Sequence, residues 1–376
     1  MKNSALYIHI PFCDHKCIYC DFYSIITKDN IPSFLISLKK EIDYYSDLYS
    51  KDHYFTSIYF GGGTPSLMDA WYISEIIDYL YKKFSISENP EITLETNPGT
   101  VGPSKLKDFF ETGINRLSIG IQSFDEDDLK FLTRIHDKTT AIDTVYNAVK
   151  AGFENISTDL IFNLPGQTKA KWIDNLQTVV ALPVKHISAY SLILERGTIL
   201  NKMVLDGKVK IKNEDYDAEL YELTIDFLET NGFFQYEVSN FSKKDYECIH
   251  NKAYWEHRNY LSLGPSAHSF VSGKRWWNFS SLKRYISEIE KNSFAVAGSE
   301  TVTKEQFFDE YIMLALRSGG ININELQTQF GDNWLKSKSN YFKELQQHNL
   351  LTYSKDNIRL TKNGYAVCDE ILLNIL

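Results

Sequence analysis

Short hydrophobic runs alternate with amphipathic segments through the first half of the chain. The runs are rich in β-branched and aromatic residues, as strands are, and they are Leu6–Ile10, Ser57–Phe60, Glu91–Glu95, Arg116–Ile121, Ile156–Phe162 and His186–Leu192. The segments between them have a helical period, and the predicted helices are Pro32–Tyr49, Asp69–Phe84, Ser104–Thr112, Thr139–Ala151 and Lys169–Ala181. Because strands that alternate with helices form βαβ units, this rhythm predicts an α/β fold with a parallel sheet. The pattern alone does not distinguish a doubly wound sheet from an incomplete barrel.

The alternation stops after residue 195. The later predicted elements are helices at Asp215–Thr230, Thr303–Arg317, Ile323–Phe330 and Asn333–His348, an aromatic-rich segment at Phe233–Phe241, and a ribbon of Leu350–Thr352 with Ile358–Thr361. Three helices and a ribbon predict an α+β, winged-helix-like C-terminal domain. We therefore expect three parts, with a core at 1–195, an extension at 196–300 and a C-terminal domain at 301–376.

Composition and charge narrow the function classes. The chain has 376 residues, of which 43% are hydrophobic and 24% are charged, as in proteins that bury a core. Its net charge of −9 argues against broad binding to nucleic acids or anionic membranes. Residues 303–376 hold eight Lys and Arg against nine Asp and Glu, so the winged-helix-like part lacks the basic surface that DNA binding requires.

The sequence contains no apolar run long enough to span a bilayer, and its N-terminal residues do not resemble a secretory signal. We therefore expect a cytoplasmic protein in a reducing compartment, where cysteines are thiols or metal ligands rather than disulfides. Three of the five cysteines fall within eight residues, at Cys13, Cys17 and Cys20.

The C-x3-C-x2-C spacing follows the first predicted strand directly and brings three soft thiolate ligands into one loop. A [4Fe-4S] cluster has four irons, so three cysteines leave one iron free to chelate an amino acid. Structural zinc is the first alternative, but zinc usually takes four ligands, and His15 or Asp21 would supply the fourth at an unusual spacing. Chance clustering on a loop is the second alternative.

The loop resembles that of the radical S-adenosylmethionine (SAM) superfamily, in which it follows the first strand of a partial (β/α)6 barrel. The run Phe60-Gly-Gly-Gly-Thr-Pro65 ends the second predicted strand, where glycines permit close approach of a ligand to the backbone. Polar residues also mark the ends of later strands, at Glu95, Gln122 and Asp159. In α/β barrels this face carries the active site.

The whole chain is similar to the oxygen-independent coproporphyrinogen III oxidase group. The stretches that carry this resemblance are Tyr7-Ile-His-Ile-Pro-Phe-Cys13, Phe60–Pro65, Gly120-Ile-Gln-Ser-Phe124 and Asp159-Leu-Ile-Phe-Asn-Leu-Pro-Gly166. The resemblance implies SAM contacts at Tyr7, Tyr19, Gly62, Gly63, Thr64, Glu95, Gln122, Arg134 and Asp159. A solvated helix arginine is the structural alternative for Arg134.

Two departures argue against oxidase activity. The oxidases have a further cysteine two residues after the third, where this chain has Phe22, and they carry an extension ahead of the first strand, which here begins near residue 5. Both departures match the HemW branch of heme chaperones, which also has a His-Asn-x-x-Tyr-Trp motif. This chain contains His250-Asn-Lys-Ala-Tyr254-Trp255.

The motif suits heme, because a histidine nitrogen can ligate heme iron and aromatic rings offer a porphyrin a flat apolar surface. The resemblance thus implies heme binding at His250, Tyr254 and Trp255, and transfer of heme to acceptor proteins such as respiratory enzymes at the membrane. A loop histidine packed on aromatic rings is the structural alternative for His250. A radical SAM enzyme acting on a porphyrinogen is the alternative function. The heme acceptor, a homodimeric state and the role of Cys248 stay open.

Overall fold

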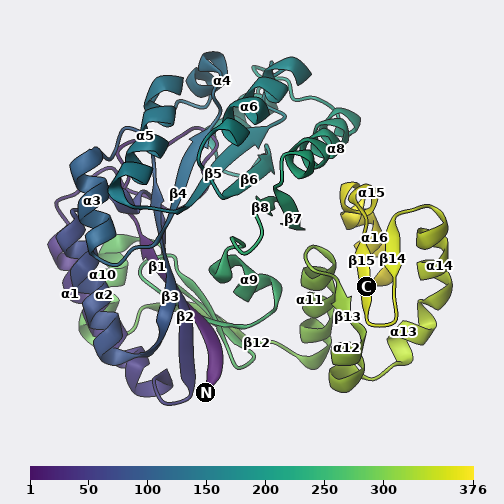
Figure 1. The fold of residues 1–376 in the computed structure, drawn as a ribbon. Helices are drawn as coiled ribbons and strands as arrows, with labels where there is room; N and C mark the ends of the chain where they lie inside the picture. Colours follow the sequence, from purple (N-terminus) through teal and green to yellow (C-terminus); the bar gives the residue numbers. More distant parts are fainter.

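Six parallel strands form the middle of one large sheet in the computed structural model, which describes residues 1–376 (Figure 1). They are β1 (Lys2–Ile10), β2 (His53–Gly62), β3 (Ser85–Thr96), β4 (Arg116–Gln122), β5 (Asn155–Phe162) and β6 (His186–Ser191). The connecting helices are α1 (Ile31–Tyr49), α2 (Ala70–Lys83), α3 (Pro103–Glu111), α4 (Glu126–Phe131), α5 (Lys138–Ala151) and α6 (Lys169–Ala181), with a 3-10 turn at Pro65–Leu67. Every strand and helix predicted for residues 1–195 is confirmed. The short helix α4 was not predicted.

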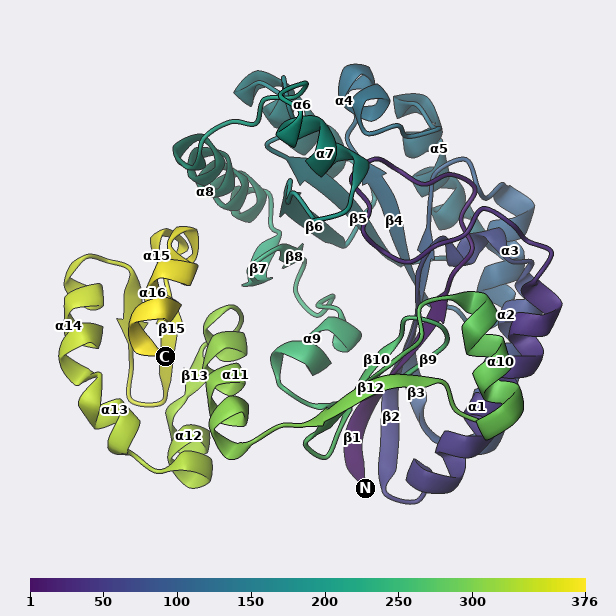
Figure 2. The ribbon, with the colours of Figure 1, turned by 180° about the vertical axis from the view of Figure 1, so that it is seen from behind.

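The sheet continues beyond both sides of the six strands, which the hydrophobic pattern did not predict. Beyond β6 lie β8 (Asn240–Ser242) and β7 (Phe234–Glu237), and beyond β1 lie β9 (Asn259–Leu263), β10 (His268–Val271), β11 (Lys274–Asn278) and β12 (Val296–Thr301). Strand β9 is parallel to β1, whereas the others pair antiparallel. The helices of this region are α7 (Ile199–Leu205), α8 (Glu214–Thr230), α9 (Ile249–Trp255) and α10 (Leu282–Asn292). The twelve strands form an open, curved barrel wall, and α9 lies on its concave side (Figure 2).

Successive side chains of each strand point to opposite faces of the sheet. One face packs in the hydrophobic core under the helices, and the other faces the interior of the barrel. On β4, Leu117, Ile119 and Ile121 are fully buried in the main hydrophobic cluster, beneath the helices. The residues between them point to the opposite face, which is polar. The same cluster extends from Leu6 to Ala295, so residues 196–300 share one core with the barrel.

The C-terminal body has a hydrophobic core of its own, built from residues between Tyr311 and Ile375. Its elements are α11 (Lys304–Leu316), β13 (Ile321–Asn322), α12 (Ile323–Phe330), α13 (Asn333–Ser337), α14 (Ser339–Gln347), β14 (Leu351–Tyr353), β15 (Asn357–Leu360), α15 (Lys362–Ala366) and α16 (Cys368–Ile375). Helices packed on a small antiparallel sheet agree with the predicted winged-helix-like fold.

The helix predicted at Asn333–His348 was wrong in one respect, because it is divided at Lys338 into α13 and α14. The hydroxyl of Ser337 donates to the carbonyl of Trp334 at 2.7 Å, and such a local bond competes with a continuing helix.

None of the helices is long and apolar enough to cross a bilayer.

Candidate functional site: a polar cavity at the carboxyl ends of the strands

A cavity of about 470 Å³ opens at the carboxyl ends of the parallel strands and reaches into the barrel. All three cysteines of the loop line it, as do all nine residues for which a SAM contact was predicted: Tyr7, Tyr19, Gly62, Gly63, Thr64, Glu95, Gln122, Arg134 and Asp159. The structure therefore brings together residues that lie far apart in the sequence. Phe22, which stands where the oxidases have a further cysteine, is 61% exposed and also lines this cavity.

The cysteine loop presents three free thiols that are half-buried. No three His, Cys, Asp or Glu side chains gather closely enough to hold one metal ion. In a [4Fe-4S] cube, however, each thiolate ligates a different iron, so the sulfurs need not converge on one point. Soft thiolates on one loop at the mouth of a cavity fit such a cluster.

A chain of hydrogen bonds connects two of the cysteines. The hydroxyl of Thr64 lies 3.3 Å from Cys13 Sγ and accepts a hydrogen bond from Asn97 Nδ2 at 2.9 Å. Arg134 Nη2 donates to Asn97 Oδ1 at 2.7 Å, and Arg134 Nη1 donates to Cys17 Sγ at 3.7 Å. Arg134 is thus a half-buried member of the cysteine site rather than a solvated helix residue.

The glycine run after β2 brings the backbone close to two strands. A Cβ on Gly63 would lie 2.5 Å from the carbonyl oxygen of Phe12, and Gly62 has φ +108°, so neither position accepts a larger residue without rearrangement. Gly62 N donates to Glu95 Oε2 at 3.1 Å, while the hydroxyl of Tyr59 donates to Glu95 Oε1 at 3.0 Å. Burial, reinforced by the nearby Asp159 carboxylate, raises the pKa of Glu95 to about 7.

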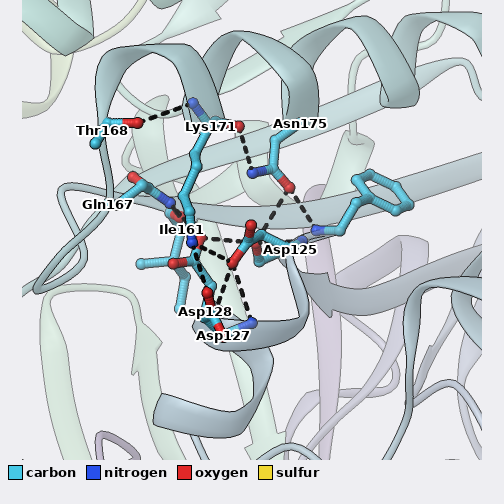
Figure 3. A network of polar contacts seen from close by, with 10 residues as sticks. Asp125, Asp127, Asp128, Ile161, Gln167, Thr168, Lys171 and Asn175 are labelled. Carbon is cyan, nitrogen blue, oxygen red and sulfur yellow. Dashed lines mark hydrogen bonds and ion pairs between the residues drawn. The ribbon is translucent and has the colours of Figure 1, made fainter.

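Gln122 ends β4 with a left-handed backbone, at φ +71°. The turn that follows is held by a polar network with α6 (Figure 3). Asn175 Oδ1 accepts hydrogen bonds from Ser123 Oγ and Phe124 N, and Lys171 Nζ pairs with Asp125 at 2.9 Å. A strained residue persists only where its surroundings fix it, and this network provides that support.

The motif residues at 250–255 lie apart from the cysteines. His250 is fully buried, its Nδ1 lies 3.0 Å from Ser57 Oγ, and its Nε2 lies 3.0 Å from the Tyr254 hydroxyl. Burial, followed by repulsion from Arg116, lowers the pKa of His250 to about 3, so the ring is neutral. His250 and Tyr254 do not line the cysteine cavity, whereas the intervening Asn251 does.

Trp255 lines a second cavity, of about 1000 Å³, between α9 and the C-terminal body. Helix α9 therefore separates the two cavities, with Asn251 facing one and Trp255 facing the other. Cys248 caps the start of this helix and is completely buried, with its Sγ 3.4 Å from Glu91 Oε1. His268, at the start of β10, is exposed and outside both cavities.

Sequence reasoning missed several cavity residues on the inward face of the strands, namely Tyr59, Asn97, Arg116, Ser118, Ser188 and Tyr190. The alternation of polar and apolar residues along the strands could have indicated these residues. Parallel strands covered by helices are usually apolar on both faces, so polar residues at every second position indicate a polar interior.

Comparisons with known proteins agree with this geometry. Residues 7–179 match the radical SAM superfamily, and residues 302–367 match the HemN C-terminal domain. The chain is 32% identical to the heme chaperone HemW of Bacillus subtilis, over 99% of this chain and 98% of that one. It is 34% identical to radical S-adenosyl methionine domain-containing protein 1, mitochondrial, of Danio rerio, over 100% of this chain and 87% of that one.

The structure of coproporphyrinogen III oxidase (HemN) from Escherichia coli superimposes with a TM-score of 0.84 at 21% identity, covering 100% of this chain and 90% of that one. At this identity the likeness shows the fold alone. The full-length similarity to HemW proteins is closer, and it includes both matched domains. The chain therefore belongs to the HemW family within the radical SAM superfamily.

Proposed function

We propose that this protein is a heme chaperone, which binds heme and passes it to acceptor proteins. The observation that carries the proposal is the similarity to the HemW of Bacillus subtilis along nearly the whole of both chains. The motif at His250, Tyr254 and Trp255 supports it, because it offers one imidazole and two aromatic faces on a single short helix.

The cysteine cavity fits a [4Fe-4S] cluster on Cys13, Cys17 and Cys20, with SAM beside it. The cluster would supply an open iron and an electron source. Glu95 offers acceptors for an amino group, and the glycine run permits its close approach to the backbone. Arg134 donates hydrogen bonds to Cys17 Sγ and to the carbonyl of Gly120 in β4. Tyr7, Tyr19, Thr64, Gln122 and Asp159 complete the proposed SAM contacts.

Heme ligation by His250 requires α9 to move. Both ring nitrogens are engaged and the side chain is 1% exposed, so no ligand can reach it while α9 rests on β2. Asp245 and His257, on either side of α9, have left-handed backbones at φ +68° and +51°. They lie in the two loops that flank the seven-residue helix, and these loops would have to change conformation when it moves.

Radical SAM chemistry on a porphyrinogen is the second candidate. It is favoured by the cavity itself, which continues past the cysteines to the polar residues of the barrel interior and so has room beside the cluster. We do not expect coproporphyrinogen oxidase activity, because Phe22 stands at the position of the further cysteine.

One experiment separates the two functions. The protein is purified anaerobically, its cluster is reconstituted, and hemin is titrated while the Soret band is followed. The chaperone proposal predicts stoichiometric binding that His250→Ala weakens markedly. Conversion of coproporphyrinogen III in the presence of SAM, without stoichiometric heme binding, would support the enzyme instead.

We further propose three parts: a core at 1–195, an extension at 196–300 and a C-terminal domain at 301–376. The extension shares the hydrophobic core of the barrel, whereas the C-terminal domain has its own core, which begins at Tyr311. Proposed partners are heme and heme-accepting proteins, including respiratory enzymes at the membrane, with a homodimer as a possible assembly. The proposed location is the cytoplasm, with peripheral contact to the membrane.

A further inference from the structure

Arg116 lies at the start of β4 and faces the barrel interior. It shares that face with Ser118 and Gly120, and all three line the cysteine cavity, whereas Leu117 and Ile119 pack in the hydrophobic core. Arg116 is 1% exposed. A guanidinium, which is always charged, is therefore held inside the barrel at the end of the cavity remote from the carboxyl ends of the strands.

The hydrogen-bonding capacity of Arg116 is not fully used. Its Nε is buried without a hydrogen-bond partner, and its ion pair with Glu91 Oε2 is long, at 3.8 Å. Buried arginines normally use several of their five N–H groups in hydrogen bonds, because leaving them unpaired forfeits the hydration they had in water.

Glu91 is hydrogen-bonded to α9 as well as paired with Arg116. Glu91 Oε2 accepts from Ile249 N at 3.1 Å, and Oε1 accepts from His250 N at 3.0 Å. The carboxylate thus caps the first turn of α9.

Two carboxylates on the strands of the cavity, Glu95 and Asp159, also have other partners. Both oxygens of Asp159 accept from Ser118 Oγ at 3.3 Å, and Glu95 is bound by Tyr59 and Gly62. Burial raises the pKa of both groups, and the nearby Arg116 guanidinium opposes that rise. Arg116 therefore lines the cavity with a buried Nε that has no hydrogen-bond partner, while the nearby carboxylates are hydrogen-bonded to other groups.

We propose that Arg116 binds a carboxylate of the ligand that enters this cavity. An arginine fork accepts a carboxylate through two parallel hydrogen bonds, and its position at the inner end of the cavity would select ligands that reach past the cysteine loop. Two molecules carry the required group. One is heme, through a propionate, and this source rests on the proposed function; the other is SAM, through its own carboxylate.

The test compares ligands with and without the carboxylate in the reconstituted full chain. Arg116→Met removes the charge at similar volume, and Arg116→Lys keeps the charge without the fork. Each variant is titrated with hemin and its dimethyl ester, and with SAM and decarboxylated SAM. Thermal unfolding checks that each variant is folded.

For the ligand that uses Arg116, we expect Arg116→Met to weaken binding of the acid form about tenfold to a hundredfold and to leave the carboxylate-free form within twofold. Arg116→Lys should give an intermediate loss, and it decides the question if the methionine variant does not fold. Affected hemin identifies the propionate, and affected SAM identifies the SAM carboxylate.

Equal losses for acid and carboxylate-free forms, or no loss for either acid, would overturn the proposal. If the wild-type protein binds no hemin, the chaperone function fails, while the SAM titrations still decide the role of Arg116.

Discussion

The hydroxyl of Tyr254 lies 3.0 Å from Nε2 of His250 and engages the ring nitrogen that Ser57 leaves free. Both ring nitrogens of His250 are thus engaged by hydroxyl groups of this chain. Tyr254 also packs edge-on against this imidazole, with ring centroids 5.1 Å apart. The hydroxyl and the aromatic ring of Tyr254 therefore have opposite expected effects on heme binding.

Tyr254→Phe should strengthen hemin binding or speed it, because it keeps the aromatic face and frees the imidazole nitrogen. Loss of one hydrogen bond of about 1 kcal/mol corresponds to a change of about fivefold. Tyr254→Ala should instead weaken binding, because it removes the ring surface. Stopped-flow absorbance at the Soret band measures both, and slower or weaker binding by Tyr254→Phe would contradict this arrangement.

Alanine at Cys13, Cys17 or Cys20 should remove most of the iron and sulfide after anaerobic reconstitution, because each thiolate is needed to hold the cube. Cys368→Ala is the matched control, since that cysteine is buried in the core of the C-terminal body. Iron and sulfide analysis is the readout. A loop variant that retains the wild-type content would disprove the assignment of its cysteine.

Asn175→Ala should weaken SAM binding several-fold while the iron content stays constant. It deprives Phe124 N of a buried acceptor, at a cost of about 1–3 kcal/mol, and loosens the turn that fixes Gln122, although Ser123 Oγ keeps its bond to Asp128. Gln177→Ala, at an exposed position of the same helix, is the control. Unchanged SAM affinity in a folded Asn175→Ala protein would mean that the network in Figure 3 stabilises only the fold.

Glu41 should make stability depend on pH. It is fully buried, where it accepts hydrogen bonds from Gly264 N, Asn278 Nδ2 and the Tyr285 hydroxyl, yet burial still raises its pKa to about 7. Because the folded-state pKa exceeds the unfolded one, the folded state binds more protons between about pH 4.5 and pH 7, and stability falls as pH rises through this window.

The contribution that is lost amounts to about 3 kcal/mol. Glu41→Gln cannot ionise, so its free energy of unfolding should lack this component of the pH slope, whatever its absolute stability. Urea unfolding at pH 5, 6, 7 and 8 compares the two proteins. Parallel pH profiles would show that Glu41 does not titrate in this range.

The sequence predicted the parallel strands and their helices because hydrophobic periodicity and element length were both clear there. It missed β9 to β12, because these strands are short, and Trp276 and Trp277 alternate too weakly to mark a buried face. The pairing of β9 with β1 joins segments some 250 residues apart, and local pattern contains no information on such contacts.

The candidate site divides in a similar way. The cysteines and strand-end residues could be predicted from spacing and resemblance, and they share one cavity. The environment of His250 could not be predicted, because its partner Ser57 lies on β2, 193 residues away. Arg116 was taken only as the first residue of a strand, and its burial without a full complement of hydrogen bonds emerges only from the packing around it.

The most direct test of the chaperone function is transfer of heme from the loaded protein to a heme-free acceptor. Wild-type and His250→Ala proteins are loaded with hemin, separated from free hemin and mixed with membranes that contain a heme-depleted respiratory enzyme, whose regained activity is followed. The account predicts recovery with the wild type and little with His250→Ala. Equal recovery with both proteins would contradict the chaperone function. So would the absence of recovery with a fully loaded wild-type protein when free hemin restores the enzyme.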